Sequence, residues 1–278
     1  MSTLIAEPKV SFPASPARDI SPIPQYSLGK ILLVWAAAAV PMGILGWLVG
    51  PALARNSQTP GLVRIGVLTA GLIWQFVLLL ILLYRETGTL RWSVVRERLW
   101  LTTPRSPQTG EPRRRLWWWL VPLVVVTAIF ELRVSPVVTR FWVSLFPFLA
   151  EPEIYALGTF LDTPEARAQM TGAWGTFVLF TLSALFNSFL GEELLFRGLL
   201  LPRMAGRFGR WDWVMNALLF GLYHLHQPWG ILNSAIKALL FVAFPTRHFR
   251  SSWFGVVAHS GQSIYFTFLL LGLVLGLA

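Results

Sequence analysis

Long apolar runs separated by short polar segments dominate the chain from residue 31 onward. A helix that crosses a bilayer needs about 20 mostly apolar residues. Residues 141–150 are also apolar, but Pro147 and the short length of this run predict an interfacial or re-entrant piece. The remaining pattern predicts an all-α polytopic membrane bundle of about seven to eight transmembrane helices. Its candidate spans are 31–50, 65–84, 116–131, 174–200, 211–226, 229–245 and 253–276.

The composition agrees with a protein whose main partner is the lipid bilayer. Of the 278 residues, 55% are hydrophobic and only 13% are charged, whereas a soluble domain has about 25% charged residues. Fourteen tryptophans fit the aromatic belts at membrane interfaces. The chain has no cysteine, which excludes disulfides and a thiolate nucleophile.

The net charge of +10 is distributed as a membrane topology requires. Basic residues dominate the connecting segments 85–115, 198–210 and 246–252, whereas 150–173 is acidic. Cytoplasmic loops of membrane proteins carry excess Lys and Arg. Seven spans and a cytoplasmic N-terminus would place every basic segment inside, most simply in a plasma (inner) membrane. We therefore expect no nucleic-acid partner.

Three regions are expected along the chain. Residues 1–29 contain five prolines and no long apolar run, which predicts a disordered cytoplasmic tail rather than a cleavable signal. Residues 30–171 hold the N-terminal helices, the basic loop 85–115 and the acidic external segment 150–173. Residues 172–278 form a helical core that contains the polar motifs considered next.

Two neighbouring glutamates interrupt the fourth apolar run. No charged residue lies between Trp174 and Glu192, and charge at membrane depth usually has a functional reason. Glu193 and Arg197 are at positions i and i+4, with the glutamate first, the favoured order for an ion pair. Glu192 faces another direction and lacks an evident ion-pair partner. It therefore suits a general base working near neutral pH.

All four histidines follow residue 223. Phe220 and His224 are four residues apart and share a helix face, as do His259 and Ser263. The turn between the fourth and fifth spans falls near Phe208, midway between Glu192 and His224 in the sequence. Both residues then lie roughly 24 Å from this turn, at similar depth. His259 reaches the same depth only if the last span is tilted or Arg250 lies deep.

Other polar residues of the last spans have simpler interpretations. His226 precedes Gln227 and Pro228 and is expected at an interfacial span end. His248 lies beside Arg247 and is expected to be solvated. Lys237 is expected to extend its ammonium toward the interface, with a role against a substrate carboxylate as the alternative.

These motifs resemble those of the CPBP family, which includes the CAAX prenyl endopeptidases and bacteriocin-processing enzymes. The resemblance covers about residues 172–276. It includes Phe196-Arg197-Gly198-Leu199-Leu200 and rests on three motifs: Glu192-Glu193-x-x-x-Arg197, Phe220-x-x-x-His224 and His259-x-x-x-Ser263.

The resemblance implies specific roles. Glu192 and His224 would activate water, and His259 with the residue four positions later would bind the oxyanion. Ser263 stands where the family usually has asparagine. Two histidines and a glutamate could also hold zinc, but the glutamate–water mechanism resembles the family better. No metal or other cofactor is therefore expected.

Three functions remain in competition. The first is a glutamic-type intramembrane endopeptidase that cleaves membrane-tethered or hydrophobic C-terminal peptides, with Asn187 or Asn216 as alternative oxyanion donors. The second is a proton-coupled transporter that uses the same buried groups, although the chain lacks the repeated halves common in transporters. The third is a non-catalytic immunity or scaffold relative, for which Ser263 is the main argument.

Overall fold

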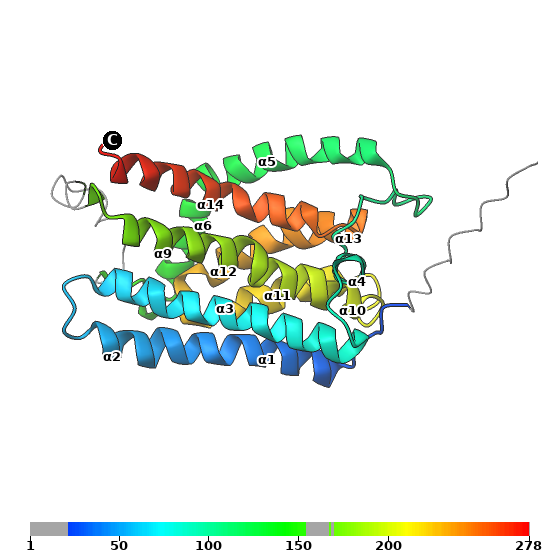
Figure 1. The fold of residues 1–278 in the computed structure, drawn as a ribbon, viewed down its shortest axis with the longest axis horizontal. Helices are drawn as coiled ribbons and strands as arrows, with labels where there is room; N and C mark the ends of the chain where they lie inside the picture. Colours follow the sequence, from blue (N-terminus) through cyan, green and yellow to red (C-terminus); the bar gives the residue numbers. More distant parts are fainter. Residues whose placement is uncertain (1–21, 154–166, 168–169, 278) are drawn as a thin grey trace, which may run out of the picture.

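The computed structural model describes residues 22–153, 167 and 170–277. These residues form an all-helical bundle whose helices lie side by side along the long axis (Figure 1). Six helical segments in this part of the chain are long and apolar enough to cross a membrane. They are Leu28–Ala54, Pro60–Thr87, Arg114–Leu145, Trp174–Met204, Pro228–Phe249 and Trp253–Val274. The predicted polytopic all-α class is therefore confirmed.

The N-terminal helices are α1 (Leu28–Ile44), α2 (Gly50–Ala54) and α3 (Pro60–Thr87). The Ser27 hydroxyl caps α1 by accepting from the Lys30 N–H at 3.2 Å. Just before this cap, Tyr26 is only 2% exposed. The predicted tail boundary at residue 29 is therefore wrong, because the chain packs against the bundle before α1 begins. Residues 1–21 lie outside the described part.

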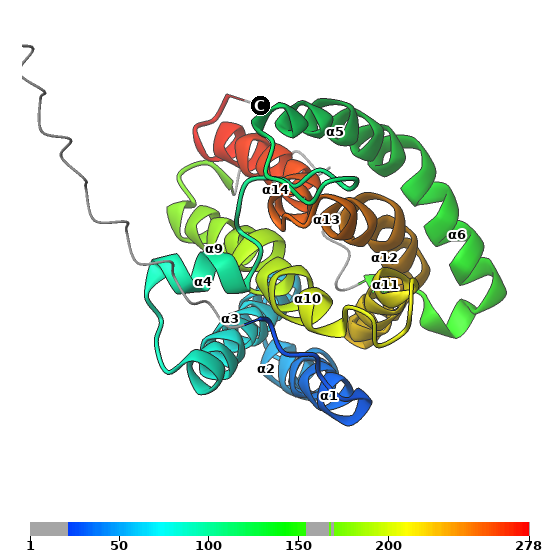
Figure 2. The same cartoon turned by 90° about the vertical axis from the view of Figure 1, so that its right-hand side faces the viewer.

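One long curved helix wraps the outside of the bundle (Figure 2). It begins with the 3-10 segment Arg114–Trp119 and continues through α5 (Leu120–Ile129), a π-helical segment (Phe130–Val134) and α6 (Ser135–Leu145). Residues 141–145 are thus the end of α6, and the prediction of a separate re-entrant piece over 141–150 is wrong. The predicted third span is correspondingly too short.

The helix that contains Glu192 and Glu193, which we call the glutamate helix, is wound irregularly. It runs through α9 (Trp174–Leu185), π-helical segments over 186–190 and 194–200, and α10 (Leu201–Met204). Gly191 lies between the two π-helical segments. A Cβ at this position would lie 2.5 Å from the Phe186 carbonyl oxygen and 2.8 Å from that of Leu72 on α3. Only glycine allows the two helices to approach this closely.

The next two helices form a short hairpin. α11 (Asp212–Tyr223) ends in the 3-10 turn His224–His226 and falls short of the length of a full span. After the turn Pro228–Gly230, the chain returns through α12 (Ile231–Lys237), a π-helical segment (Ala238–Ala243) and α13 (Phe244–Phe249). The last helix, α14 (Trp253–Val274), closes the bundle.

Side chains from other helices satisfy the backbone at the tip of this hairpin. The indole N–H of Trp47 donates to the Leu225 carbonyl at 2.8 Å, and that of Trp142 donates to the Pro228 carbonyl at 2.9 Å. Between them, the Arg64 guanidinium donates to the His226 carbonyl at 2.9 Å. Irregular backbone at membrane depth persists only when buried protein groups bond to it.

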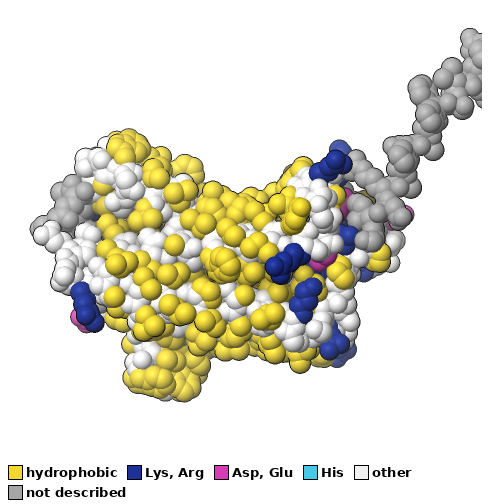
Figure 3. Space-filling model, turned by 60° about the horizontal axis from the view of Figure 1, so that its bottom comes forward, with side chains coloured by type: hydrophobic (Ala, Val, Ile, Leu, Met, Phe, Trp, Pro, Cys, Tyr) yellow, Lys and Arg dark blue, Asp and Glu magenta, His cyan; other side chains and the backbone are white. Residues whose placement is uncertain are grey.

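Basic side chains gather at one end of the molecule, where α1 begins and where α4 (Trp92–Arg98), α10 and α13 lie (Figures 1 and 3). The segment that leads into α9 lies at the opposite end with the C-terminus. There the Gly172 N–H donates to the Val274 carbonyl at 2.9 Å. The basic end agrees with the predicted charge pattern. Most of the predicted acidic external segment 150–173 lies outside the described residues, and the orientation in a membrane stays a prediction.

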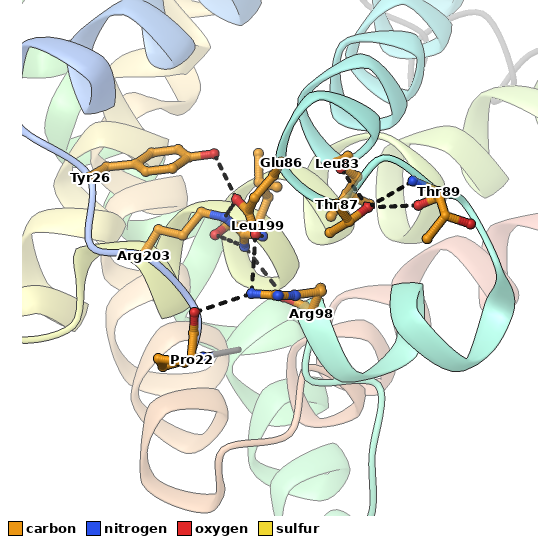
Figure 4. Close-up of polar contacts among 9 residues, drawn as sticks. All are labelled: Pro22, Tyr26, Leu83, Glu86, Thr87, Thr89, Arg98, Leu199 and Arg203. Atoms are coloured by element: carbon orange, nitrogen blue, oxygen red, sulfur yellow. Dashed lines mark hydrogen bonds and ion pairs between the residues drawn. The ribbon is translucent and has the colours of Figure 1, made fainter. Parts of the chain in front are cut away.

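A buried charge cluster joins the N-terminal segment to the glutamate helix (Figure 4). Arg203 is fully buried and donates to both carboxylate oxygens of Glu86, each at 2.7 Å. Arg98 lies 3.5 Å from the same carboxylate and donates to the Pro22 carbonyl. Burial raises the pKa of Tyr26, so its hydroxyl stays protonated and donates to Glu86 at 3.4 Å. We call these five residues the basic-end clasp.

Candidate active site

Glu193, Arg197 and His259 meet inside the bundle. Both side chains of the Glu193–Arg197 pair are 0% exposed, and their charged atoms lie 3.2 Å apart. The same carboxylate oxygen of Glu193 also lies 3.0 Å from His259 Nδ1. The predicted i, i+4 ion pair is present, and a histidine from α14 joins it. His259 thus contacts Glu193, the neighbour of the proposed base.

Phe220 lies at the centre of the motif residues. The Arg197 guanidinium stacks over its ring, 3.9 Å from the centroid. The same ring makes edge-on contacts with His224 and His259, at centroid distances of 4.8 Å and 6.1 Å. One residue from each motif, Arg197, His224 and His259, therefore contacts the same phenyl ring.

The hydrogen bonds of His224 define its tautomer. Its Nδ1 lies 2.9 Å from the backbone carbonyl oxygen of Phe220. A carbonyl oxygen can only accept, so Nδ1 carries the hydrogen and Nε2 of the neutral ring keeps a free lone pair. Nε2 can then accept a proton or a hydrogen bond from water.

His226 differs from its prediction. It is 4% exposed, and its ring stacks on that of His224 with centroids 5.6 Å apart. His226 does lie at the end of the hairpin's first helix, in the 3-10 turn His224–His226, but its side chain is buried and does not open to the interface. His248 is exposed, as expected.

Glu192 is buried, with only 2% of its surface exposed. Its carboxylate lies close enough to the Tyr223 hydroxyl to interact with it, while Oε2 has no hydrogen-bond partner among the described residues. Behind Tyr223 lies Gln75, whose amide nitrogen donates to the Tyr223 hydroxyl oxygen at 2.7 Å. Sequence analysis missed both residues, although a glutamine inside the apolar run 65–84 was an available signal.

Lys237 also differs from its prediction. It is 9% exposed and forms an ion pair with Glu131 from the π-helical segment between α5 and α6. Its ammonium also donates to the Gln262 amide oxygen at 3.4 Å. The expected extension toward the interface is wrong, because the curved helix supplies a buried carboxylate. Glu131 at the end of a predicted span was the missed signal.

The three candidate oxyanion donors have different surroundings. Ser263 and Asn187 both line a cavity of about 410 Å³ between α9 and α14. Glu192, His224 and His259 do not line this cavity. Asn216 is fully buried and donates to the Phe196 carbonyl at 2.9 Å. Its amide is therefore already engaged in linking α11 to the glutamate helix.

Within the described ranges, no group of three or more His, Asp or Glu side chains is arranged to hold a metal ion. Metal independence of the protein stays a prediction.

The fold and the site define the class of protein. It is an integral membrane protein with carboxylate and histidine side chains buried inside its helical bundle. Residues 173–277 match the family described as type II CAAX prenyl endopeptidase Rce1-like, which supports the CPBP resemblance of the motifs in this segment. This match supports a CAAX-type intramembrane endopeptidase in general. No curated protein and no solved structure matches the chain.

Proposed function

We propose that this protein hydrolyses a peptide bond in a membrane-associated or hydrophobic C-terminal substrate, using water activated by Glu192. The observation that carries the proposal is the contrast between the two neighbouring glutamates. Glu193 is engaged by Arg197 and His259. Glu192 is equally buried but forms no ion pair in the described part of the chain. Oε2 of each glutamate lacks a hydrogen-bond partner there, but only the Glu192 carboxylate is not held by a cation. We therefore assign its Oε2 to the water molecule.

The reaction follows from these positions. The carboxylate of Glu192 removes a proton from water, while Nε2 of His224 accepts a hydrogen bond from the same molecule. The water oxygen then bonds to the carbonyl carbon of the substrate. As the carbon–nitrogen bond breaks, the proton held by Glu192 passes to the leaving nitrogen. General acid–base catalysis of this kind contributes about 10²–10⁴ in rate.

His259 is proposed to stabilise the oxyanion. Its Nδ1 hydrogen is directed to Glu193, so it binds an oxyanion through a hydrogen on Nε2. The ring then carries both hydrogens, and its positive charge lies beside the Glu193 carboxylate, which it shares with Arg197. Preorganised donors of this kind contribute most in a site from which water is excluded.

The decisive experiment replaces Glu192 by glutamine and follows cleavage of a membrane-tethered reporter peptide by the purified protein. We expect the rate to fall by about 10²–10⁴ while the protein remains folded, because glutamine preserves the shape of the side chain. Glu111→Gln is the matched control, since Glu111 is 71% exposed and lies far from the motifs in sequence. Cleavage by Glu192→Gln at the wild-type rate would remove the proposed base.

A non-catalytic role is the second candidate, and one observation favours it. Ser263, which replaces the usual asparagine, lines the cavity between α9 and α14, whose walls do not include Glu192 or His224. Failure of the wild-type protein to cut any of a panel of hydrophobic and prenylated peptides, together with unchanged cellular function of Glu192→Gln, would establish this role.

A further inference from the structure

The helix α3 lies outside the segment that matches the family, yet one of its side chains reaches the site. Gln75 is 0% exposed, and its amide nitrogen lies 2.7 Å from the Tyr223 hydroxyl oxygen. A buried amide in an apolar helix costs free energy unless it is hydrogen-bonded. This bond compensates for burial of the amide nitrogen, whereas the amide oxygen Oε1 has no hydrogen-bond partner among the described residues. It also connects the N-terminal half of the chain to the residue that precedes His224.

The direction of the hydrogen bonds along this chain of groups is fixed by chemistry. An amide nitrogen can only donate, so the Tyr223 oxygen accepts from Gln75. The single phenolic hydrogen of Tyr223 is then free for the Glu192 carboxylate, which lies close enough to interact with this hydroxyl. The order of donation is therefore from Gln75 to Tyr223 to Glu192.

The ring of Tyr223 is held in place from several sides. It is 0% exposed and lies between Phe196 and His224, at ring-centroid distances of 5.3 Å and 5.0 Å. Its hydroxyl therefore cannot swing away from Glu192 without displacing these neighbours. The position of the Glu192 carboxylate is thus set by groups on α3 and α11, in addition to its own helix.

We propose that Tyr223 and Gln75 are positioning residues for Glu192, an inference that rests on the proposed function. The Tyr223 hydroxyl restrains the Glu192 carboxylate, and Oε2, which has no hydrogen-bond partner among the described residues, is the oxygen that receives the proton from water. Gln75 holds the phenol in the orientation that this requires. The site is then completed by a helix that lies outside the matched segment 173–277.

The test is a kinetic analysis of Tyr223→Phe with the membrane-tethered reporter peptide. We expect kcat to fall about 10- to 100-fold, because a hydrogen bond to a charged group is lost, while KM stays unchanged. Tyr26→Phe is the matched control. It also removes a buried hydroxyl that donates to a glutamate, but in the basic-end clasp, and it should keep the wild-type kcat.

The role of Gln75 is tested by a double-mutant cycle. Gln75→Met preserves the length of the side chain and should lower kcat less than Tyr223→Phe does, because the phenol can still donate. In the Tyr223→Phe background the same change should have no further effect on kcat, since coupled residues are not additive. If Tyr223→Phe does not fold, Gln75→Met alone decides the question: wild-type kcat in that variant would overturn the proposal.

The outcomes separate this inference from the proposed function. Loss of cleavage in Glu192→Gln with wild-type kcat in Tyr223→Phe overturns the positioning role alone. A rise in KM at constant kcat also overturns it, because the hydroxyl would then serve substrate binding. Wild-type cleavage in both variants overturns the proposed function itself.

Discussion

Adjacent positions on one helix give Glu192 and Glu193 different surroundings. Successive residues point about 100° apart, so Glu193 faces Arg197 and α14, whereas Glu192 faces Tyr223 on α11. The first glutamate of the pair is therefore suited to proton transfer, and the second to holding neighbouring side chains in place. This division of roles leads to different expectations for two otherwise identical substitutions.

Glu193→Gln should destabilise the protein, in contrast to Glu192→Gln. The substitution leaves the fully buried Arg197 without its counter-charge, and removing one partner of a buried ion pair costs about 3–5 kcal/mol. Thermal unfolding of both variants in detergent would measure the difference. An unchanged Tm for Glu193→Gln would contradict the assigned roles.

The oxyanion donor is the second question at the residue scale. Removing one donor costs about 10²–10³ in rate, so Ser263→Ala should lose activity on that order and Ser263→Asn should retain most of it. Asn187 lines the same cavity as Ser263 and is the alternative. Should Ser263→Ala cleave the reporter normally while Asn187→Ala does not, the donor belongs to the glutamate helix.

Contacts within one helix could be predicted from the sequence, and contacts between helices mostly could not. The Glu193–Arg197 pair follows from helical spacing alone. The bonds of Gln75 to Tyr223 and of Lys237 to Glu131 depend on how helices far apart in the sequence rotate against each other. No local pattern encodes that rotation.

Among the elements, the glutamate helix shows what hydropathy does not reveal. The apolar pattern predicted one regular span over 174–200, but π-helical turns cover 186–190 and 194–200. Such turns are frequent at functional sites, and they alter the direction in which each following side chain points. The curved helix also contains a π-helical segment, Phe130–Val134, through which α5 continues into α6 as one element.

Gly191→Ala tests the close approach of the glutamate helix to α3. The new methyl group would overlap backbone oxygens of Phe186 and Leu72, which cannot move as a flexible side chain could. Overpacking of this kind costs about 1–3 kcal/mol and should displace Glu192, so both Tm and cleavage rate should fall. Gly175→Ala on the same helix is the control, since its added Cβ meets nothing within 4 Å. Equal behaviour of the two variants would contradict the predicted overlap.

On the scale of the whole molecule, the two halves of the chain cannot be regarded as an enzyme and a dispensable anchor. The basic-end clasp joins residues 22–26, the end of α3 and α10, the end of the glutamate helix. At the hairpin tip, Trp47 and Arg64 bond the backbone that follows His224. Hydropathy and charge predicted the all-helical membrane class and the basic end of the bundle. The contacts between the two halves of the chain arise only from packing.

The short hairpin has a consequence for the surrounding lipid. From Asp212 to His226 it is about 22 Å long, against roughly 30 Å for the hydrocarbon core of a bilayer. Leu218, Leu222 and Leu225 are exposed along α11 and therefore face the acyl chains. This hydrophobic mismatch should thin the bilayer beside the tip, at a cost that grows with bilayer thickness. Cleavage of the reporter should then be faster in vesicles of short-chain phosphatidylcholine than in long-chain ones, and equal rates would show that the protein covers the tip from lipid.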